Sequence, residues 1–377
     1  MPLSPCSKEE LGEGQEVWCS LAPCDEDATS PCCSPLEHRY GRLVTALVYA
    51  ASLCGDLFWT AAILNALGTS LSVVMGIPVE TSILVSAGVT TLYTMVGQMI
   101  SVAYTDVAQL LLMTVGLVGS LRPIHRQQRA GRKHHTEQGA LVWSDRERLD
   151  PALDRPGFGN DWSNSSLTSG LDPVSANQSS MVLPLMLKEF TPDAVSIMGL
   201  GAVSAAVMSS MDSAVLGSSS MFTHNLYKPS LRPKASDREL LWVQRLSIFV
   251  IGAAATAMSI YIRTVWGLFV LAADIVYVIV LPQLTCALFV PSTNAYGALT
   301  AFLAGAILRI GAGETTLNLP AFIRYPLYDE GTGEQKFPFR LVAFAAAMLC
   351  HVVVSVMMAT CFKRGWLPAA WNRLRGR

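Results

Sequence analysis

Long apolar runs separated by polar stretches dominate the pattern of this chain. A helix of about 20 apolar residues is long enough to cross the hydrocarbon core of a bilayer. By that criterion the pattern predicts eight membrane-spanning helices and therefore an all-α polytopic membrane protein. The expected spans are 43–75, 81–100, 104–120, 194–222, 240–262, 265–290, 294–310 and 341–362.

The polar stretches between these runs divide the chain into five segments. We expect a disordered, Cys/Pro-rich leader over 1–40, three spans within 41–120, a polar extracellular loop over 121–193, five spans within 194–363, and a short basic cytoplasmic tail over 364–377. Within the polar loop, residues 181–190 are apolar enough to form a short interfacial helix.

The placement of charge orients these spans. Lys and Arg are enriched in 228–238 and from Lys363 onward, and cytoplasmic loops carry such an excess. Asn164 and Asn177 lie in Asn-x-Ser sequons, which predict glycosylation and an extracellular loop. One feature conflicts with this topology, because the same loop opens on five basic residues: Arg122, Arg126, Arg129, Arg132 and Lys133.

The composition restricts the classes of function. Only 15% of the residues are charged, 51% are hydrophobic and the net charge is −1, so no basic domain for nucleic acid is present. The nine cysteines lack the paired spacing of a zinc site. We find no nucleophile–base set, phosphate loop or hydride-cofactor fingerprint, and so expect neither an enzyme nor a cofactor.

Polar residues are concentrated in one predicted span, 194–222. At helical spacing Ala206, Ser209, Ser210 and Ser213 lie on one stripe, which offers a backbone carbonyl and hydroxyl oxygens. Two interpretations remain open. Small residues and hydroxyls of this kind form close helix-packing faces, and the same oxygens also suit a hard cation such as sodium. Asp212 lies beside this stripe and not on it.

The residues SAAVMSSMDSAVLGSSSMFTHNLYK resemble the ninth span of the sodium/solute symporter family. GDLFWTAAILNALGTSLSVVMG and TTLYTMVGQMISVAYTDVAQLL are also similar to that family, and about two-thirds of the chain resembles its choline-transporting branch. This resemblance implies an inverted-repeat sodium-symporter bundle of thirteen spans. Three N-terminal spans have no counterpart, and 121–159 replaces two more, so the bundle is incomplete, with about eight of thirteen spans.

The resemblance also implies roles for individual residues. The carbonyl of Ala206 and the hydroxyls of Ser209 and Ser210 would form one wall of a sodium site whose opposite wall lies on a missing helix. Trp59 would belong to an aromatic cage for the quaternary ammonium of choline, which is held by cation–π contacts. Its alternative is an interfacial or packing aromatic. Asp212 would couple ions, and its alternative is a packing acid.

Three further acids have less specific interpretations. Asp56, one turn before Trp59, either adds negative potential or forms a structural pair. Asp106 is expected to cap a helix, and Asp274 to face the bundle without an assigned role.

The activity implied by the resemblance is sodium-dependent, chloride-requiring uptake of choline by alternating access, supplying acetylcholine synthesis. The implied partners are choline, sodium, chloride and the lipid bilayer, with a homo-oligomer left open. The implied location is the plasma membrane of presynaptic terminals and the synaptic vesicle membrane. If the junction that replaces the two missing spans is real, we expect no sodium-dependent choline uptake by this chain alone. The alternative function is a truncated, non-transporting isoform that associates with or regulates a full-length transporter.

Overall fold

The computed structural model describes residues 35–139, 179–189, 192–317, 319–329, 335 and 337–366, with only the backbone for most of 117–139. The predicted glycosylation sites Asn164 and Asn177 lie outside the described residues. So do the first 34 residues of the expected leader and the last eleven of the expected tail.

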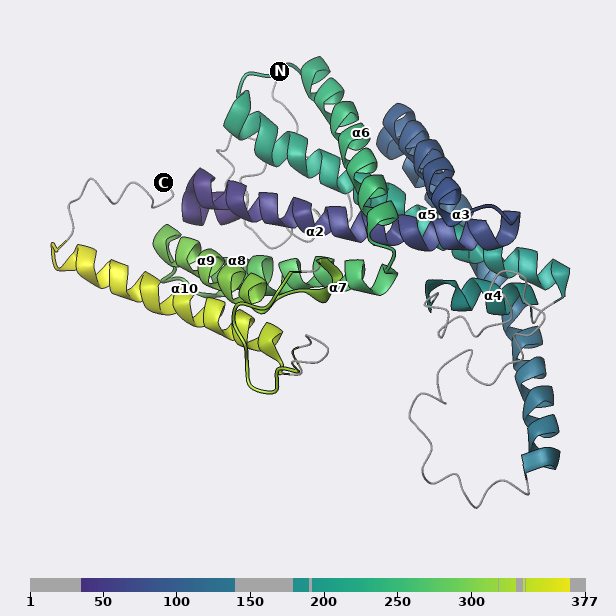
Figure 1. The fold of residues 1–377 in the computed structure, drawn as a ribbon. Helices are drawn as coiled ribbons and strands as arrows, with labels where there is room; N and C mark the ends of the chain where they lie inside the picture. The colour runs from purple at the N-terminus through teal and green to yellow at the C-terminus, as the bar shows by residue number, and fades with distance from the viewer. Residues whose placement is uncertain are drawn as a thin grey trace. The chain divides into compact units, whose positions relative to one another are not determined.

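Helices account for the described part of the chain almost entirely (Figure 1). In order they are α2 (Pro35–Met75), α3 (Val79–Gly139), η4 (Ser179–Met181), α4 (Val182–Glu189), α5 (Asp193–Met221), η5 (Phe222–Leu231), α6 (Asp237–Tyr261), α7 (Val265–Ile275), η6 (Val276–Val280), α8 (Leu281–Phe289), α9 (Ala295–Gly311), η7 (Thr315–Leu317) and α10 (Phe339–Lys363). The described residues form two isolated β-bridges and no strand. The all-α prediction is therefore confirmed.

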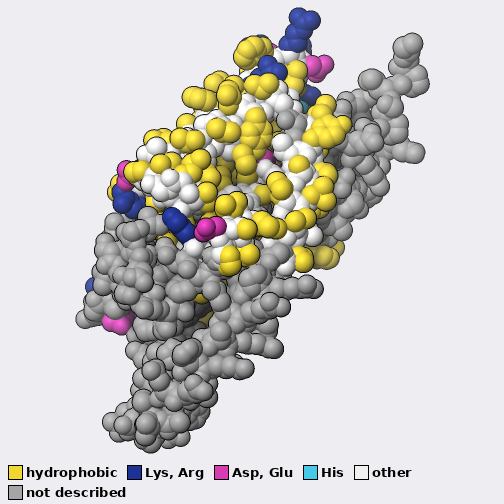
Figure 2. Space-filling model, turned by 90° about the vertical axis from the view of Figure 1, so that its right-hand side faces the viewer, with side chains coloured by type: hydrophobic (Ala, Val, Ile, Leu, Met, Phe, Trp, Pro, Cys, Tyr) yellow, Lys and Arg dark blue, Asp and Glu magenta, His cyan; other side chains and the backbone are white. Residues whose placement is uncertain are grey.

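Most of the predicted spans appear as long apolar helices. Among the described residues, six helical segments are long and apolar enough to cross a membrane. The predicted spans 104–120 and 294–310 form shorter apolar helices, Val102–Gly116 and Ala295–Gly311. On the face shown in Figure 2, hydrophobic side chains predominate among the described residues and charged ones are few. Such an apolar exterior is unusual for a soluble protein and is that of a multi-pass membrane protein.

The first helix begins earlier than the sequence pattern predicts. α2 starts at Pro35, so the last six residues of the expected leader are helical. Leu36 and Tyr40 are each 1% exposed and belong to a hydrophobic core cluster. Arg39 donates hydrogen bonds to the carbonyls of Ala287 and Val290, at 2.7 and 2.8 Å. These carbonyls end α8, where helices leave acceptors unpaired. The first forty residues are therefore not all leader.

α3 corrects the expected boundary of the polar loop. The helix contains a sharp kink at Gln98 (φ 46°, ψ −146°), near the end of the predicted span 81–100. After the kink the backbone remains helical through Gly139. The first nineteen residues of the predicted loop 121–193 are therefore helical. Arg, Gln, Lys and Glu supply nine of these nineteen residues, and all four have high helix propensity although they are polar.

The chain divides into two compact units. The first comprises Met1–Trp59, Ala214–Ile251 and Trp266–Arg377. Here the N-terminal part of α2 packs with α8 and α9, and α9 and α10 lie side by side (Figure 1). Asn294 caps α9 by accepting from the Gly297 N–H at 3.1 Å. Its amide also donates to the Ser355 carbonyl of α10 at 2.9 Å, so the start of α9 is tied to α10.

The second unit comprises Thr60–Ser213 and Gly252–Val265. Its hydrophobic cluster is built from α2, α4 and α5. α4 is the short helix predicted near 181–190, and two of its leucines pack into this cluster. Asn65 of α2 donates to the carbonyls of Ser259 and Ile262 at the end of α6, at 3.2 and 3.3 Å. Lys188 donates to the Val73 carbonyl in the last turn of α2 at 2.9 Å. Polar side chains thus satisfy two helix ends in this unit.

Candidate binding sites

A cavity of about 390 Å³ opens in the first unit, between α2 and the α7–η6–α8 segment. Its volume falls in the range of small-molecule sites, which are mostly apolar with a few polar groups. The lining residues are Gly55, Asp56, Trp59, Phe269, Ala272, Ala273, Val276, Tyr277 and Leu281. Residues 269, 272, 273, 276 and 277 share one helical face, so a single side of α7 and η6 forms the wall opposite Trp59.

Three aromatic rings face this cavity. The Trp59 and Phe269 rings lie 5.6 Å apart at an interplanar angle of 52°. Tyr277 stacks on Phe344 of α10, with centroids 4.8 Å apart and an angle of 18°. Trp59 contacts the Phe269 ring but is still 38% exposed, so its own ring is not enclosed. Ring faces accessible from a cavity can accept a cation within about 6 Å of the centroid.

One carboxylate accompanies the rings. Asp56 lies one turn before Trp59 on α2 and lines the same cavity. Its Oδ2 accepts a hydrogen bond from the Ser218 hydroxyl at 3.2 Å, which joins α5 to the cavity wall. The two interpretations of Asp56 are thus compatible, since it has a polar partner and also contributes negative charge beside aromatic faces. This combination suits a small organic cation whose ammonium group has no N–H donor.

The serine stripe lies in the second unit, on α5. The Ser210 hydroxyl donates to the Ala206 carbonyl at 3.2 Å, so two of the three predicted sodium ligands contact each other. The Ser209 hydroxyl donates to Asp106 Oδ1 at 2.7 Å. Ala206 and Ser209 are half-buried, and Ser210 is exposed. The stripe therefore presents a carbonyl, two hydroxyls and a neighbouring carboxylate.

The sequence pattern predicts Asp106 as a helix cap, and this prediction is wrong, because Asp106 lies inside α3. Its carboxylate contacts the stripe, a contact between residues 103 positions apart in sequence. The signal that could have identified it is the cost of an acid inside an apolar run, which favours a functional role. An oxygen-only set of this kind suits a hard cation. Among the described residues, no cluster of three or more His, Cys, Asp or Glu residues forms a softer metal site.

Asp212 is separate from that hydrogen-bonded set. It is fully buried, and its carboxylate accepts hydrogen bonds from the Tyr93 hydroxyl and, at 3.4 Å, from Thr94. Both partners belong to α3. Asp212 is therefore satisfied as a packing acid would be, and this contact joins α5 to α3 near the serine stripe.

Comparison with known proteins agrees with this architecture. The profile of the Sodium:solute symporter family matches residues 36–124 and 173–305, more than half of the chain. The human High affinity choline transporter 1 is 36% identical over 394 residues, which cover 89% of this chain and 68% of that protein. The Caenorhabditis elegans High-affinity choline transporter 1 is 35% identical over 397 residues, which cover 90% and 68%.

The alignment with the human protein also contains positions that this chain lacks. Its 394 positions exceed the roughly 336 residues that make up 89% of this chain, so about 58 positions have no counterpart here. The family profile is interrupted between residues 124 and 173. This interruption includes most of 121–159, the stretch that by the resemblance replaces two spans of the family.

A solved structure has the same fold. A Na+-coupled sialic acid symporter in its substrate-bound outward-open state superposes with a TM-score of 0.58 at 16% identity, over 85% of this chain and 76% of that one. The relatives found by sequence are transporters, and the matched profile covers both α2 and α5. This multi-pass membrane protein therefore belongs to the sodium:solute symporter family.

Proposed function

We propose that this chain binds choline in the aromatic cavity and couples that binding to sodium at the serine stripe of α5. The observation that carries the proposal is the cavity itself, in which the rings of Trp59, Phe269 and Tyr277 lie beside the carboxylate of Asp56. Choline has a permanent positive charge and its ammonium has no N–H group. Aromatic faces and a nearby carboxylate are therefore the groups that recognise it.

Sodium is the proposed coupling ion. The carbonyl of Ala206, the hydroxyls of Ser209 and Ser210, and the carboxylate of Asp106 would supply its oxygens. Asp106 adds the negative charge that three neutral oxygens lack. Asp212 would hold α5 against α3 through Tyr93 and so support coupling without contacting the ion.

The proposed activity is sodium-dependent and chloride-requiring uptake of choline by alternating access across the plasma membrane, as in presynaptic terminals, where it would supply acetylcholine synthesis. A ligand shifts an equilibrium between two states by its differential affinity for them. Sodium bound to α5 would favour the state in which the aromatic cavity is open to choline.

Binding of labelled choline to the full chain in nanodiscs tests the substrate. Trp59→Leu keeps an apolar side chain but removes the ring, so choline binding should weaken about two- to thirtyfold, from a contact of about 0.5–2 kcal/mol. Trp242→Leu is the matched control, because Trp242 is 69% exposed and lies outside the cavity. Equal losses in both variants, or no choline binding by the folded wild type, would refute the proposal.

The ion site is tested by the dependence of choline binding on sodium. Ser209→Ala and Asp106→Asn should each raise the sodium concentration needed for half-maximal choline binding. Ser219→Ala on the same helix should not, because the Ser219 hydroxyl bonds locally to the Leu216 carbonyl at 2.8 Å. A sodium requirement that is unchanged in the first two variants would exclude the stripe.

A second candidate function follows from the roughly 58 alignment positions that have no counterpart in this chain. A symporter without two internal spans would bind choline yet fail to move it. Such a chain would associate with a full-length transporter and regulate its uptake. Uptake into proteoliposomes separates the two functions: binding without uptake, together with altered uptake by a co-reconstituted full-length choline transporter, favours the regulator.

A further inference from the structure

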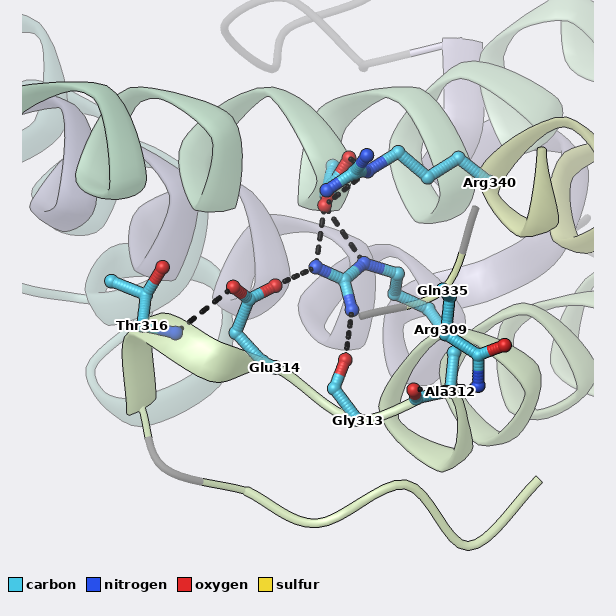
Figure 3. Close-up of polar contacts among 8 residues, drawn as sticks. Arg309, Ala312, Gly313, Glu314, Thr316, Gln335 and Arg340 are labelled. Carbon is cyan, nitrogen blue, oxygen red and sulfur yellow. Dashed lines mark hydrogen bonds and ion pairs between the residues drawn. The ribbon is translucent and has the colours of Figure 1, made fainter. Parts of the chain in front are cut away.

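Four charged side chains form a cluster at one end of α9 in the first unit (Figure 3). Arg309 of α9 donates from Nε and Nη2 to Asp274 Oδ2 of α7, at 2.8 and 2.5 Å. It also bonds to Glu314 and, from Nη1, to the Gly313 carbonyl at 3.3 Å. Arg340 of α10 reaches Asp274 Oδ1 at 2.7 Å and Oδ2 at 2.9 Å through its Nε.

The cluster is electrically balanced and largely removed from solvent. The side chains of Asp274, Arg309 and Glu314 are 7%, 9% and 12% exposed. Two positive and two negative charges therefore compensate one another in a region where an unpaired charge is costly. Buried ion pairs add little net stability compared with apolar packing, but removing one partner is strongly destabilising. Such a cluster constrains geometry more than it adds to the free energy of folding.

Asp274 connects this cluster to the aromatic cavity. The adjacent residue Ala273 lines the cavity, as do Val276 and Tyr277, two and three positions after Asp274. The π-helical turn η6 begins at Val276, so both Val276 and Tyr277 belong to it. A π turn departs from regular helical register and is frequent at functional sites. The directions in which the side chains of η6 point are therefore not set by α-helical geometry alone.

α10 holds the same wall at a second point. Phe344, which stacks on the cavity residue Tyr277, lies four residues after Arg340. Side chains four apart lie on the same helical face. One face of α10 thus contacts both the carboxylate of Asp274 and the ring of Tyr277. Phe339 adds to this contact, with the guanidinium groups of Arg309 and Arg340 5.3 and 4.9 Å from its ring centroid.

We infer that Arg309 and Arg340 are positioning residues for the organic cation. They fix α7 at Asp274, and so keep the Tyr277 ring directed at the cavity while Phe344 supports it from behind. The inference deepens the proposed function and depends on it in one respect, that the cavity binds choline. Neither arginine lines the cavity, so their effect on affinity is indirect.

Arg340→Gln is the variant that tests this inference. Arg340 is 43% exposed, and its loss leaves Asp274 paired with Arg309, so the protein should fold. We expect the dissociation constant for choline to rise about tenfold, the value of one cation–π contact of intermediate strength. Arg340→Lys retains the charge and should restore most of the affinity. In a Tyr277→Leu background, Arg340→Gln should have no further effect, because both changes remove the same contact.

The matched control is Arg263→Gln, which breaks an exposed ion pair with Glu80 in the other unit. It should leave choline affinity unchanged. The inference is overturned if Arg340→Gln binds choline as the wild type does, or if its effect simply adds to that of Tyr277→Leu.

A second measurement keeps the inference independent of the choice of substrate. Ala273 is exposed in the cavity wall, so a cysteine placed there by Ala273→Cys is open to a water-soluble thiol reagent. Arg340→Gln should raise its labelling rate at least twofold over the matched parent. If the wild type does not bind choline but this rate rises, the proposed substrate is wrong and the positioning role stands. An unchanged rate contradicts the positioning role whatever the cavity binds.

Discussion

Replacing Gly297 by alanine tests the packing of α9 on α10 at its closest point. A Cβ at this position would lie deep inside van der Waals contact of the Ser355 hydroxyl and the His351 carbonyl, and 3.1 Å from the Ser355 Cβ. The His351 carbonyl belongs to the backbone of α10, so it moves only if the helix moves. α10 must therefore shift away from α9 to accept the methyl group.

The expected loss of stability follows from those contacts. Overpacking of a well-packed site costs about 1–3 kcal/mol. The shift also disturbs the hydrogen bonds from Asn294 to the Ser355 hydroxyl and carbonyl, now 3.1 and 2.9 Å long. Each such bond contributes about 1 kcal/mol. Alanine gains about 1 kcal/mol over glycine in a helix, which offsets part of the loss. We expect a net destabilisation of about 2–4 kcal/mol.

Thermal unfolding of the purified chain in detergent, followed by tryptophan fluorescence, measures this effect. Gly217→Ala is the matched control, because Gly217 lies within α5 and no atom stands within 4 Å of the place that its new methyl group would take. That control should unfold at the wild-type temperature or slightly above. If Gly297→Ala were as stable as Gly217→Ala, the proposed contact between α9 and α10 would be wrong.

Three further changes test separate parts of the fold. Burial alone would raise the pKa of Glu314, but the hydrogen bond and charge of Arg309 outweigh it and hold that pKa below its usual value. The pair therefore stabilises the fold above the unfolded pKa of about 4.3 and loses this contribution as the pH falls from there through the lower folded value. Glu314→Gln should flatten the fall in unfolding temperature between about pH 5 and pH 3, and an unaltered acid profile would contradict the pairing. Gln98→Gly should raise the unfolding temperature, because φ near +46° strains any residue with a Cβ; a lower temperature would contradict this backbone. Lys188→Met should destabilise the protein by about 1 kcal/mol, because it leaves the Val73 carbonyl without its charged donor. Hydrogen exchange at the end of α2 should then rise, and unchanged exchange would argue against this cap.

Apolar run length predicted most of the fold, because crossing a bilayer imposes a length and a composition that the sequence displays directly. Apolar run length did not predict the start of α2 at Pro35. Residues 35–40 are polar in composition, and Arg39 and Tyr40 acquire their role only through contacts with α8 and with Thr293, about 250 positions away. The helix beyond residue 120 was not predicted for a different reason. Its charged residues have high helix propensity but are also typical of loops exposed to solvent.

The candidate sites were predictable where one helix supplies the chemistry. The stripe of Ala206, Ser209 and Ser210 follows from helical periodicity, and Trp59 from the resemblance. The partners that complete each site come from other helices. Asp106 contacts Ser209 across 103 positions of sequence. The partners of Asp274 are Arg309 and Arg340, which lie 35 and 66 positions away. No local pattern records such pairings.

The central claim is that an organic cation and sodium bind this chain in a coupled way. It is tested most directly by the affinity of the full chain in nanodiscs for labelled choline, in sodium and in potassium at the same ionic strength. The account predicts tighter choline binding in sodium and, by reciprocity, tighter sodium binding in choline. Equal choline affinity in the two salts, measured on a folded chain, would contradict it.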